Sequence, residues 1–308
     1  MRAIAVSIRR ILAFLGVWAA LTSAAVLAAV GLGGEEFYEK LPFRVGLEIV
    51  LTFAVLAALV FMARVVDRRP LRTIGFTPSR LPDLLGGVVL GAAILALPLA
   101  LLVLMGAAQI APDLSAFTPQ ALAIGLFVCF FNVVTQETLA RGYIFQELWG
   151  KYGAAPAAIV TTLFFLAIHA APILKGSQGL IAGANILLAS IMLCIACART
   201  GALWLAIGIH LGWNGLQGPV LGLNVTGLDL AFGSWRVFTF SGAPLLTGGD
   251  MGVEGGLVGL IGPAVGIVLV ALLVKQQPKP DFTGRPRPAR PNARKGRPAT
   301  ATKQGVDG

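Results

Sequence analysis

The 308-residue chain is 56% hydrophobic and only 12% charged, with a formal net charge of +10 and a mean hydropathy of +0.83. Because ordinary soluble domains are about 25% charged, this composition excludes a soluble enzyme or a soluble binding domain. It predicts an all-α fold, a polytopic bundle of transmembrane helices.

Eight apolar stretches approach or exceed the length of about 20 residues that a helix needs to cross the hydrocarbon core. In chain order they are residues 11–30, 46–63, 84–106, 119–149, 154–171, 179–198, 201–218 and 252–274. The fourth is longer than one span, so we expect it to project from the bilayer. Arginines precede the first stretch, as in a signal peptide, but its length favours an uncleaved helix. One transmembrane domain, residues 1–274, is therefore predicted.

The distribution of Lys and Arg predicts the orientation, because short cytoplasmic loops carry an excess of both. Arginines cluster before the first stretch and between the second and the third, at Arg2, Arg9, Arg10, Arg64, Arg68, Arg69, Arg72 and Arg80. The next loop, residues 107–118, contains no Lys or Arg. We therefore expect both termini to face the cytoplasm, in an integral protein of the bacterial inner (plasma) membrane.

Residues 275–308 form a basic tail with nine Lys and Arg against two Asp, which supplies +7 of the net charge of +10. The tail has too few apolar residues to fold, so we expect it to be disordered. Basic clusters beside a membrane are attracted to anionic lipid head groups by about 1 kcal/mol per residue. We interpret the tail as a segment that binds anionic lipid and not nucleic acid, because aromatic residues do not alternate with its charges.

Polar side chains lie inside three of the predicted spans, where an ionisable group costs about 2.5–3.5 kcal/mol and marks a functional site by default. They are Gln136, Glu137 and Arg141 in the fourth stretch, His169 in the fifth, and His210 and Asn214 in the seventh. At a rise of about 1.5 Å per residue, these positions fall at similar depths in the membrane. This agreement predicts a single buried site.

The spacing of these residues indicates which of them lie on the same face of a helix. Glu137 and Arg141, and likewise His210 and Asn214, are four residues apart and therefore share a helix face. A buried acid needs a partner, which Arg141 would supply, and an imidazole and an amide one turn apart can face one ion or one carbonyl group. Helix–helix hydrogen bonds without chemistry are the alternative. Glu137 is the one acid expected deep in the bundle, because three others lie near span ends: Glu48, Glu147 and Glu254.

Small and aromatic residues are interpreted as packing features. Glycines four residues apart, as in Gly87/Gly91 and Gly208/Gly212, let two helices approach closely. The C-x-x-C pair lacks a second pair or a nearby His, so it predicts neither a zinc nor a redox site. The residues assigned to packing or lipid contact are Cys129, Cys194, Cys197, Phe164, Phe165 and Trp213.

The three polar motifs, in this order and on separate helices, resemble the signature of the CAAX protease and bacteriocin-processing family, also called CPBP or ABI. The family series is E-E-x-x-x-R, F-x-x-x-H and H-x-x-x-N; here it reads Gln136-Glu137-x-x-x-Arg141, Phe165-x-x-x-His169 and His210-x-x-x-Asn214. Members are intramembrane endopeptidases, among them the type II CAAX prenyl proteases. The resemblance covers roughly residues 119–275 and implies hydrolysis of peptide bonds in a membrane-associated peptide or protein.

The resemblance also implies roles for the site residues. In the family the first Glu of the first motif acts as general base on the attacking water, and the second pairs with the Arg. His169, His210 and Asn214 would then either bind a zinc ion that activates water or stabilise the oxyanion of the intermediate.

The chain departs from the family where Gln136 replaces the first Glu. An amide hydrogen-bonds to water but does not take a proton from it. Three outcomes stay open: a protease with Glu137 as base, a protease in which a metal alone activates water, or a catalytically impaired relative that acts as a binding, maturation or immunity protein. Buried His, Glu and Arg also occur in ion-coupled transporters, but the inverted repeats frequent in such carriers are missing from this sequence.

Overall fold

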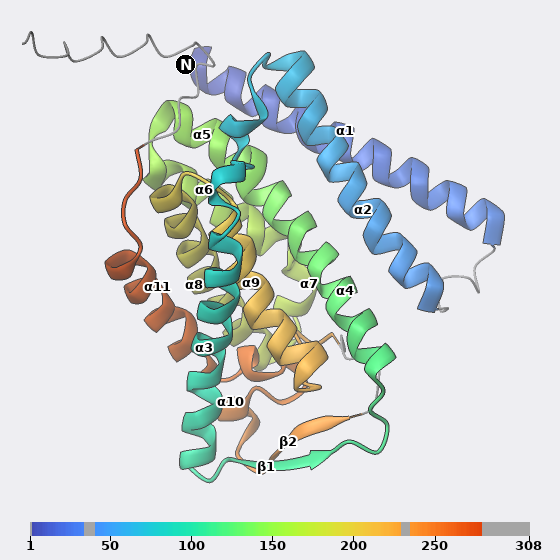
Figure 1. The fold of residues 1–308 in the computed structure, drawn as a ribbon, viewed down its shortest axis with the longest axis vertical. Coiled ribbons are helices and arrows are strands. Elements are labelled where there is room, and N and C mark those ends of the chain that lie inside the picture. The colour runs from blue at the N-terminus through green and yellow to red at the C-terminus, as the bar shows by residue number, and fades with distance from the viewer. Residues whose placement is uncertain (1, 34–40, 229–234, 279–308) are drawn as a thin grey trace, which may run out of the picture.

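The computed structural model describes residues 2–33, 41–228 and 235–278, and it confirms the predicted all-α fold (Figure 1). Most of the helices form one bundle, from which α1 and α2 diverge as a pair. The helices are α1 (Arg2–Gly33), α2 (Leu41–Phe61), α3 (Asp83–Leu104), α4 (Pro119–Glu137), α5 (Phe145–Tyr152), α6 (Ala154–Ile168), α7 (Ala170–Ile173), α8 (Gly176–Thr200), α9 (Trp204–Gly215), α10 (Pro244–Thr247) and α11 (Ile261–Leu273). Most of the predicted basic tail lies outside the described residues.

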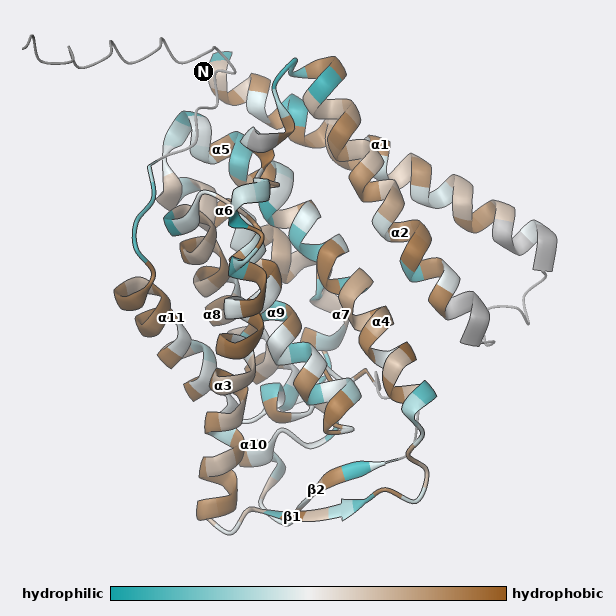
Figure 2. Cartoon of the chain, viewed as in Figure 1, coloured by the Kyte–Doolittle hydropathy of each residue, from teal (hydrophilic) through white to brown (hydrophobic). Residues whose placement is uncertain are grey.

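Five described helices are long and apolar enough to cross a membrane, namely Arg2–Ala28, Val45–Val66, Asp83–Leu104, Pro119–Tyr152 and Gly176–Thr200. Two further apolar helices, Ala154–Ile168 and Val258–Leu273, are shorter. Hydrophobic residues make up much of α1, α2, α3 and α11 (Figure 2), as expected for helices that contact lipid. The arrangement agrees with an integral membrane protein.

Three of the expected spans are shorter or interrupted in the structure. The fifth, residues 154–171, is broken at His169, because α6 ends at Ile168. The seventh, residues 201–218, contains the helix α9, which has only 12 residues. The eighth, residues 252–274, begins with short 3₁₀ turns, and its α-helix starts only at Ile261. Several glycines precede Ile261, and each disfavours a helix interior by about 1 kcal/mol, which explains the late start.

The fourth stretch does form one long helical run, but its hydrogen bonding changes midway. Between α4 and α5, Thr138–Ile144 is a π-helical segment. Such segments are rare and frequently mark functional sites. Here the segment starts directly after Glu137 and contains Arg141.

The packing of α3 against α9 confirms the prediction made from the spaced glycines. A Cβ atom on Gly91 would lie 2.1 Å from the carbonyl oxygen of Ile209, and one on Gly208 would lie 2.2 Å from that of Leu84. Such distances leave room only for glycine, so the two backbones are in direct contact. This contact fixes the helix that carries His210.

The loops at one end of the bundle, here called the strand end, contain an antiparallel pair that the sequence analysis missed. Strand β1 (Ala108–Asp113) pairs with β2 (Arg236–Phe240), with Ala108 opposite Phe240. The sequence Arg-Val-Phe-Thr-Phe is rich in the aromatic and β-branched residues that favour strands. The pair lies at this end of the bundle (Figure 1).

The opposite end, which contains α5 and is here called the basic end, is closed by a buried ionic cluster. Arg10 and Arg69 reach Asp67 at 3.1 and 3.4 Å, and Lys151 pairs with Glu147. The side chains of Asp67 and Glu147 are only 1% and 2% exposed. The cluster ties α1 to α5 and to the segment that follows α2.

Candidate active site

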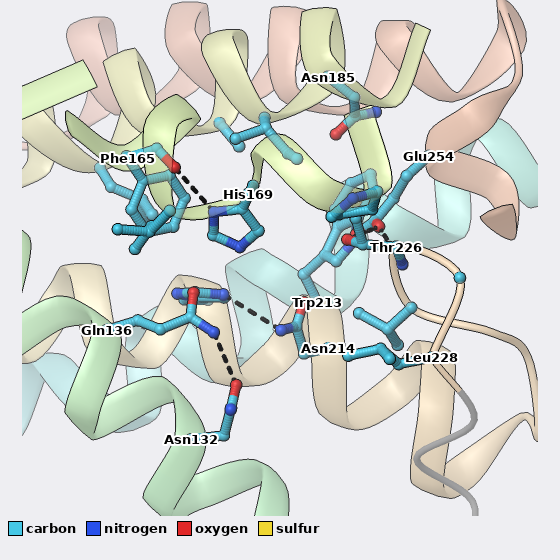
Figure 3. A pocket seen from close by; sticks show the side chains of 18 of the residues that line it. Asn132, Gln136, Phe165, His169, Asn185, Trp213, Asn214, Thr226, Leu228 and Glu254 are labelled. Atoms are coloured by element: carbon cyan, nitrogen blue, oxygen red, sulfur yellow. Dashed lines mark hydrogen bonds between the residues drawn. The ribbon is translucent and has the colours of Figure 1, made fainter. Parts of the chain in front are cut away.

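A cavity of about 500 Å³ lies among α2, α4, α6, α8 and α9 and is bounded by the loop at residues 225–228. Four of the six predicted site residues line it: Gln136, His169, His210 and Asn214. Figure 3 shows three of them, each contributed by a different part of the chain, around one open space. The remaining two, Glu137 and Arg141, do not line the cavity and lie behind its wall.

Glu137 and Arg141 form the expected ion pair, and both side chains are fully buried. Arg141 Nη1 donates to Glu137 Oε1 at 3.0 Å, and Arg141 Nη2 donates to Ser190 Oγ at 2.6 Å. The guanidinium lies 4.2 Å from the ring centroid of Phe165, a cation–π distance. Removing one member of such a pair would leave an uncompensated buried charge, so each of the two residues requires the other.

His210 is held on both sides of its ring. Its Nδ1 lies 2.9 Å from Glu137 Oε1, and because a carboxylate accepts, the ring nitrogen donates. Its Nε2 then accepts from the amide nitrogen of Asn214 at 3.1 Å. A carboxylate that fixes the tautomer and orientation of a functional imidazole is a recurring device. Glu137 therefore contacts His210 and not the cavity, which favours an orienting role over that of a base.

His169 lies where α6 ends and α7 begins. Its Nδ1 donates to the carbonyl oxygen of Phe165 at 2.8 Å, which leaves the lone pair of Nε2 available. Figure 3 shows this ring extending into the cavity. Its centroid is 4.6 Å from that of Phe165. The interpretation of Phe165 as packing alone was incomplete, because the ring lies between Arg141 and His169.

Gln136 occupies the position at which the family signature has a Glu, and it faces the cavity. Its Nε2 donates to Asn132 Oδ1 at 2.7 Å, and Asn132 Nδ2 in turn donates to Glu48 Oε1 at 3.4 Å. Gln136 Oε1 is buried without a hydrogen-bond partner in the described chain. Buried acceptors are normally satisfied, so this oxygen is a place for a water molecule in the cavity.

Two carboxylates that sequence reasoning assigned to span ends line the same cavity, Glu48 and Glu254. Glu254 Oε1 accepts from the indole of Trp213 at 2.9 Å, and Oε2 accepts from the backbone N and the Oγ1 of Thr226 at 2.7 and 2.6 Å. The expectation that Glu137 is the one deep acid was therefore wrong. The glycine-rich sequence around Glu254 was the available signal, because it places this residue in a turn and not in a helix.

The residues do not match a usual catalytic zinc site. The described part of the chain contains no group of three His, Cys, Asp or Glu side chains placed to hold a metal. A zinc ion would rest on His169, His210 and the amide of Asn214, whereas catalytic zinc sites use three His, Glu or Cys ligands. His210 Nε2 is also already engaged by Asn214. The donor set does not fit, and the reaction proposed for this site uses no metal.

Comparison with known families adds one decisive observation. Residues 118–216 match the family described as Type II CAAX prenyl endopeptidase Rce1-like. This segment is similar to that family. The match confirms the resemblance predicted from the three motifs and supports a CAAX-type intramembrane protease in general. It runs from the start of α4 to the end of α9 and so contains all six predicted site residues. No curated protein and no solved structure matches the chain.

Proposed function

We propose that the protein is an intramembrane endopeptidase that hydrolyses peptide bonds in a membrane-associated peptide or protein. The observation that carries the proposal is the convergence of Gln136, His169, His210 and Asn214 on one cavity, with a buried ion pair behind them. Two imidazoles and two amides at one cavity are groups that can bind water and a peptide carbonyl together.

In the proposed reaction His169 Nε2 accepts a proton from water as the water oxygen bonds to the carbonyl carbon. The carbonyl π electrons move to oxygen, and hydrogen bonds stabilise the resulting oxyanion. Asn214 has a second amide hydrogen for this purpose, since its first is donated to His210. When the C–N bond breaks, His169 returns the proton to the leaving amine. A base positioned in this way contributes about 10²–10⁴-fold.

Gln136 supports a second candidate, a non-cutting relative that binds a client. In the proposed protease the free Oε1 of Gln136 positions the water but takes no proton from it. In the binder the same cavity holds a peptide without hydrolysis. Activity is what distinguishes the two.

The first prediction tests this proposal in whole membranes, where no purified substrate is needed. Membranes are prepared from cells that express the unaltered protein, the His169→Ala variant or the His210→Ala variant. Newly formed peptide N-termini in these membranes are compared by mass spectrometry. N-termini that form only when the unaltered protein is present should be missing in both variants. The amount of protein inserted in the membrane should stay the same. Ile159→Ala, a change at an exposed position of α6 away from the cavity, is the matched control and should cleave normally.

Two outcomes would change the conclusion. Cleavage at the original rate in both His variants would show that the site assignment is wrong. A client that copurifies with the protein and is lost in the His variants, without any new N-terminus, would favour the binding protein.

A further inference from the structure

The cavity is open towards one end of the bundle and closed towards the other. Helix α8 runs from the strand end at Gly176 to the basic end at Thr200, about 37 Å at 1.5 Å per residue. Its cavity-lining residues Met192 and Leu193, the two nearest the basic end, are 3% and 2% exposed. They form the floor of the cavity.

The exposed lining residues lie on the other side of the site. Ile168 is 42% exposed and Leu228 is 63% exposed. Lys175, which directly precedes α8, also lines the cavity and is exposed. The mouth is therefore formed by the α6–α8 connection and the loop at residues 225–228, on the side of the strand end.

The basic end offers no comparable opening in the described residues. Between it and His210, the bundle is filled by side chains that are at most 1% exposed, including Ile144, Cys197 and Leu203. Beyond them, the ionic cluster around Asp67 and Glu147 joins α1 to α5. A substrate that approached from this end would have to break the cluster and displace part of the core.

The charges of the two ends indicate which one faces the cytoplasm. Residues at the basic end include Arg10, Arg64, Arg68, Arg69, Arg80, Lys151, Arg199 and Lys275. The opposite side has fewer, namely Arg44 near the start of α2, Lys175 and Arg236. Excess Lys and Arg mark cytoplasmic loops. The closed end is then cytoplasmic, and the mouth lies on the non-cytoplasmic side.

We infer that the cavity takes its substrate from the non-cytoplasmic side of the membrane. This inference rests on the proposed function. The substrate is then a membrane-associated peptide or protein whose scissile bond lies in the outer half of the bilayer or just outside it. A chain end presented in the cytoplasm, behind the closed end, has no path to His169 and His210.

Single cysteines test this inference, because Cys129, Cys194 and Cys197 are buried and should give little background. Lys175→Cys marks the mouth, and Ala155→Cys marks the basic end at an exposed position next to α5. Each variant is treated with a membrane-impermeant maleimide in intact spheroplasts and in inside-out vesicles. We expect Lys175→Cys to react in spheroplasts and Ala155→Cys to react only in inverted vesicles. The reverse pattern would overturn the inference.

A second pair of variants tests the cavity itself. Ile186 lines the cavity, whereas Ala182, one turn earlier on α8, is buried and does not. We expect Ile186→Cys to react with a small charged thiosulfonate applied from the non-cytoplasmic side, and Ala182→Cys to stay unlabelled. Reaction of Ile186→Cys only from the cytoplasmic side, or from neither side, would contradict the inference.

These labelling results do not depend on catalysis. If the mouth is labelled from outside but no cleavage is found, the proposed function fails, whereas the inference that the cavity opens to the non-cytoplasmic side holds. If the protein cleaves and the cavity is labelled only from the cytoplasm, the proposed function holds and this inference fails.

Discussion

At the scale of single residues, position 136 is where the chain departs from the family signature at the cavity. Its side chain faces the cavity, while Glu137 next to it is turned away and contacts His210. One residue along a helix rotates a side chain by about 100°, so in the proposed mechanism Glu137 orients His210 and does not act as the base. The motif predicted which residues meet but not which of the two adjacent polar side chains faces water.

The second prediction restores the family residue. Gln136→Glu should raise kcat by about 10-fold or more, because a carboxylate at the cavity can take the proton that an amide cannot. Steady-state cleavage of a substrate found by N-terminal mapping provides the measurement. Asn132→Asp, which places the same charge one turn away on the same helix, is the control and should not give this gain. No gain in Gln136→Glu would mean that water activation does not limit the rate.

A third prediction concerns the buried ion pair. Glu137→Gln should lower the free energy of unfolding by about 3–5 kcal/mol, because it leaves the Arg141 charge buried without its partner, and it should abolish cleavage by freeing His210. Thermal unfolding in detergent measures the first effect. The double variant Glu137→Gln/Arg141→Met removes both charges and should recover much of the stability but none of the activity. Recovery of activity in the double variant would contradict the orienting role of Glu137.

Metal content gives a fourth prediction at this scale. The protein purified in detergent should contain no stoichiometric zinc, and the double variant His169→Ala/His210→Ala should have the same metal content, because the donor set lacks a third usual ligand. Elemental analysis of both proteins measures this. About one zinc per chain, lost in the double variant, would replace the His169 mechanism by a metal-activated water.

At the scale of helices, the position of the site depends on the close contact of α3 and α9. The spaced glycines predicted that helices approach closely there but not which helices meet, and the structure shows the contact at Gly91 and Gly208. The break between α6 and α7 and the π-helical segment after Glu137 were not predictable from hydropathy. Both features depend on the pattern of backbone hydrogen bonds. The spacing of apolar residues in the sequence gives no information about that pattern.

The fifth prediction tests the helix contact. Gly91→Ala should destabilise the protein by about 1–3 kcal/mol, because the added Cβ would meet the carbonyl of Ile209 at 2.1 Å. It should also lower kcat, since α9 carries His210 and Asn214. Gly86→Ala on the same helix, where a Cβ meets nothing within 4 Å, is the control and should be neutral or slightly stabilising. Equal thermal stability of the two variants would argue against the close contact.

At the scale of the whole molecule, composition was enough to predict the fold class, and the motifs pointed to six residues that lie at or directly behind the wall of one cavity. Composition could not reveal which distant segments complete the cavity. Glu48 contacts Asn132 across 84 residues of sequence, and Glu254 contacts Trp213 across 41. Such pairings depend on tertiary packing, and each of these acids looked peripheral because it lies near a span end. The strand pair was missed for the same reason, since each strand is short and its partner is far away in sequence.

The two additional carboxylates have a consequence for how sequences of this kind are compared. The segment that matches the Rce1-like family, residues 118–216, contains neither Glu48 nor Glu254, although both line the cavity. A classification of active and inactive relatives that reads only the motif positions would find an amide at position 136 and overlook the acids supplied from outside the segment. A substitution within a motif therefore does not by itself mean that the cavity lacks acidic side chains, and the residues of the whole cavity wall are needed to decide this.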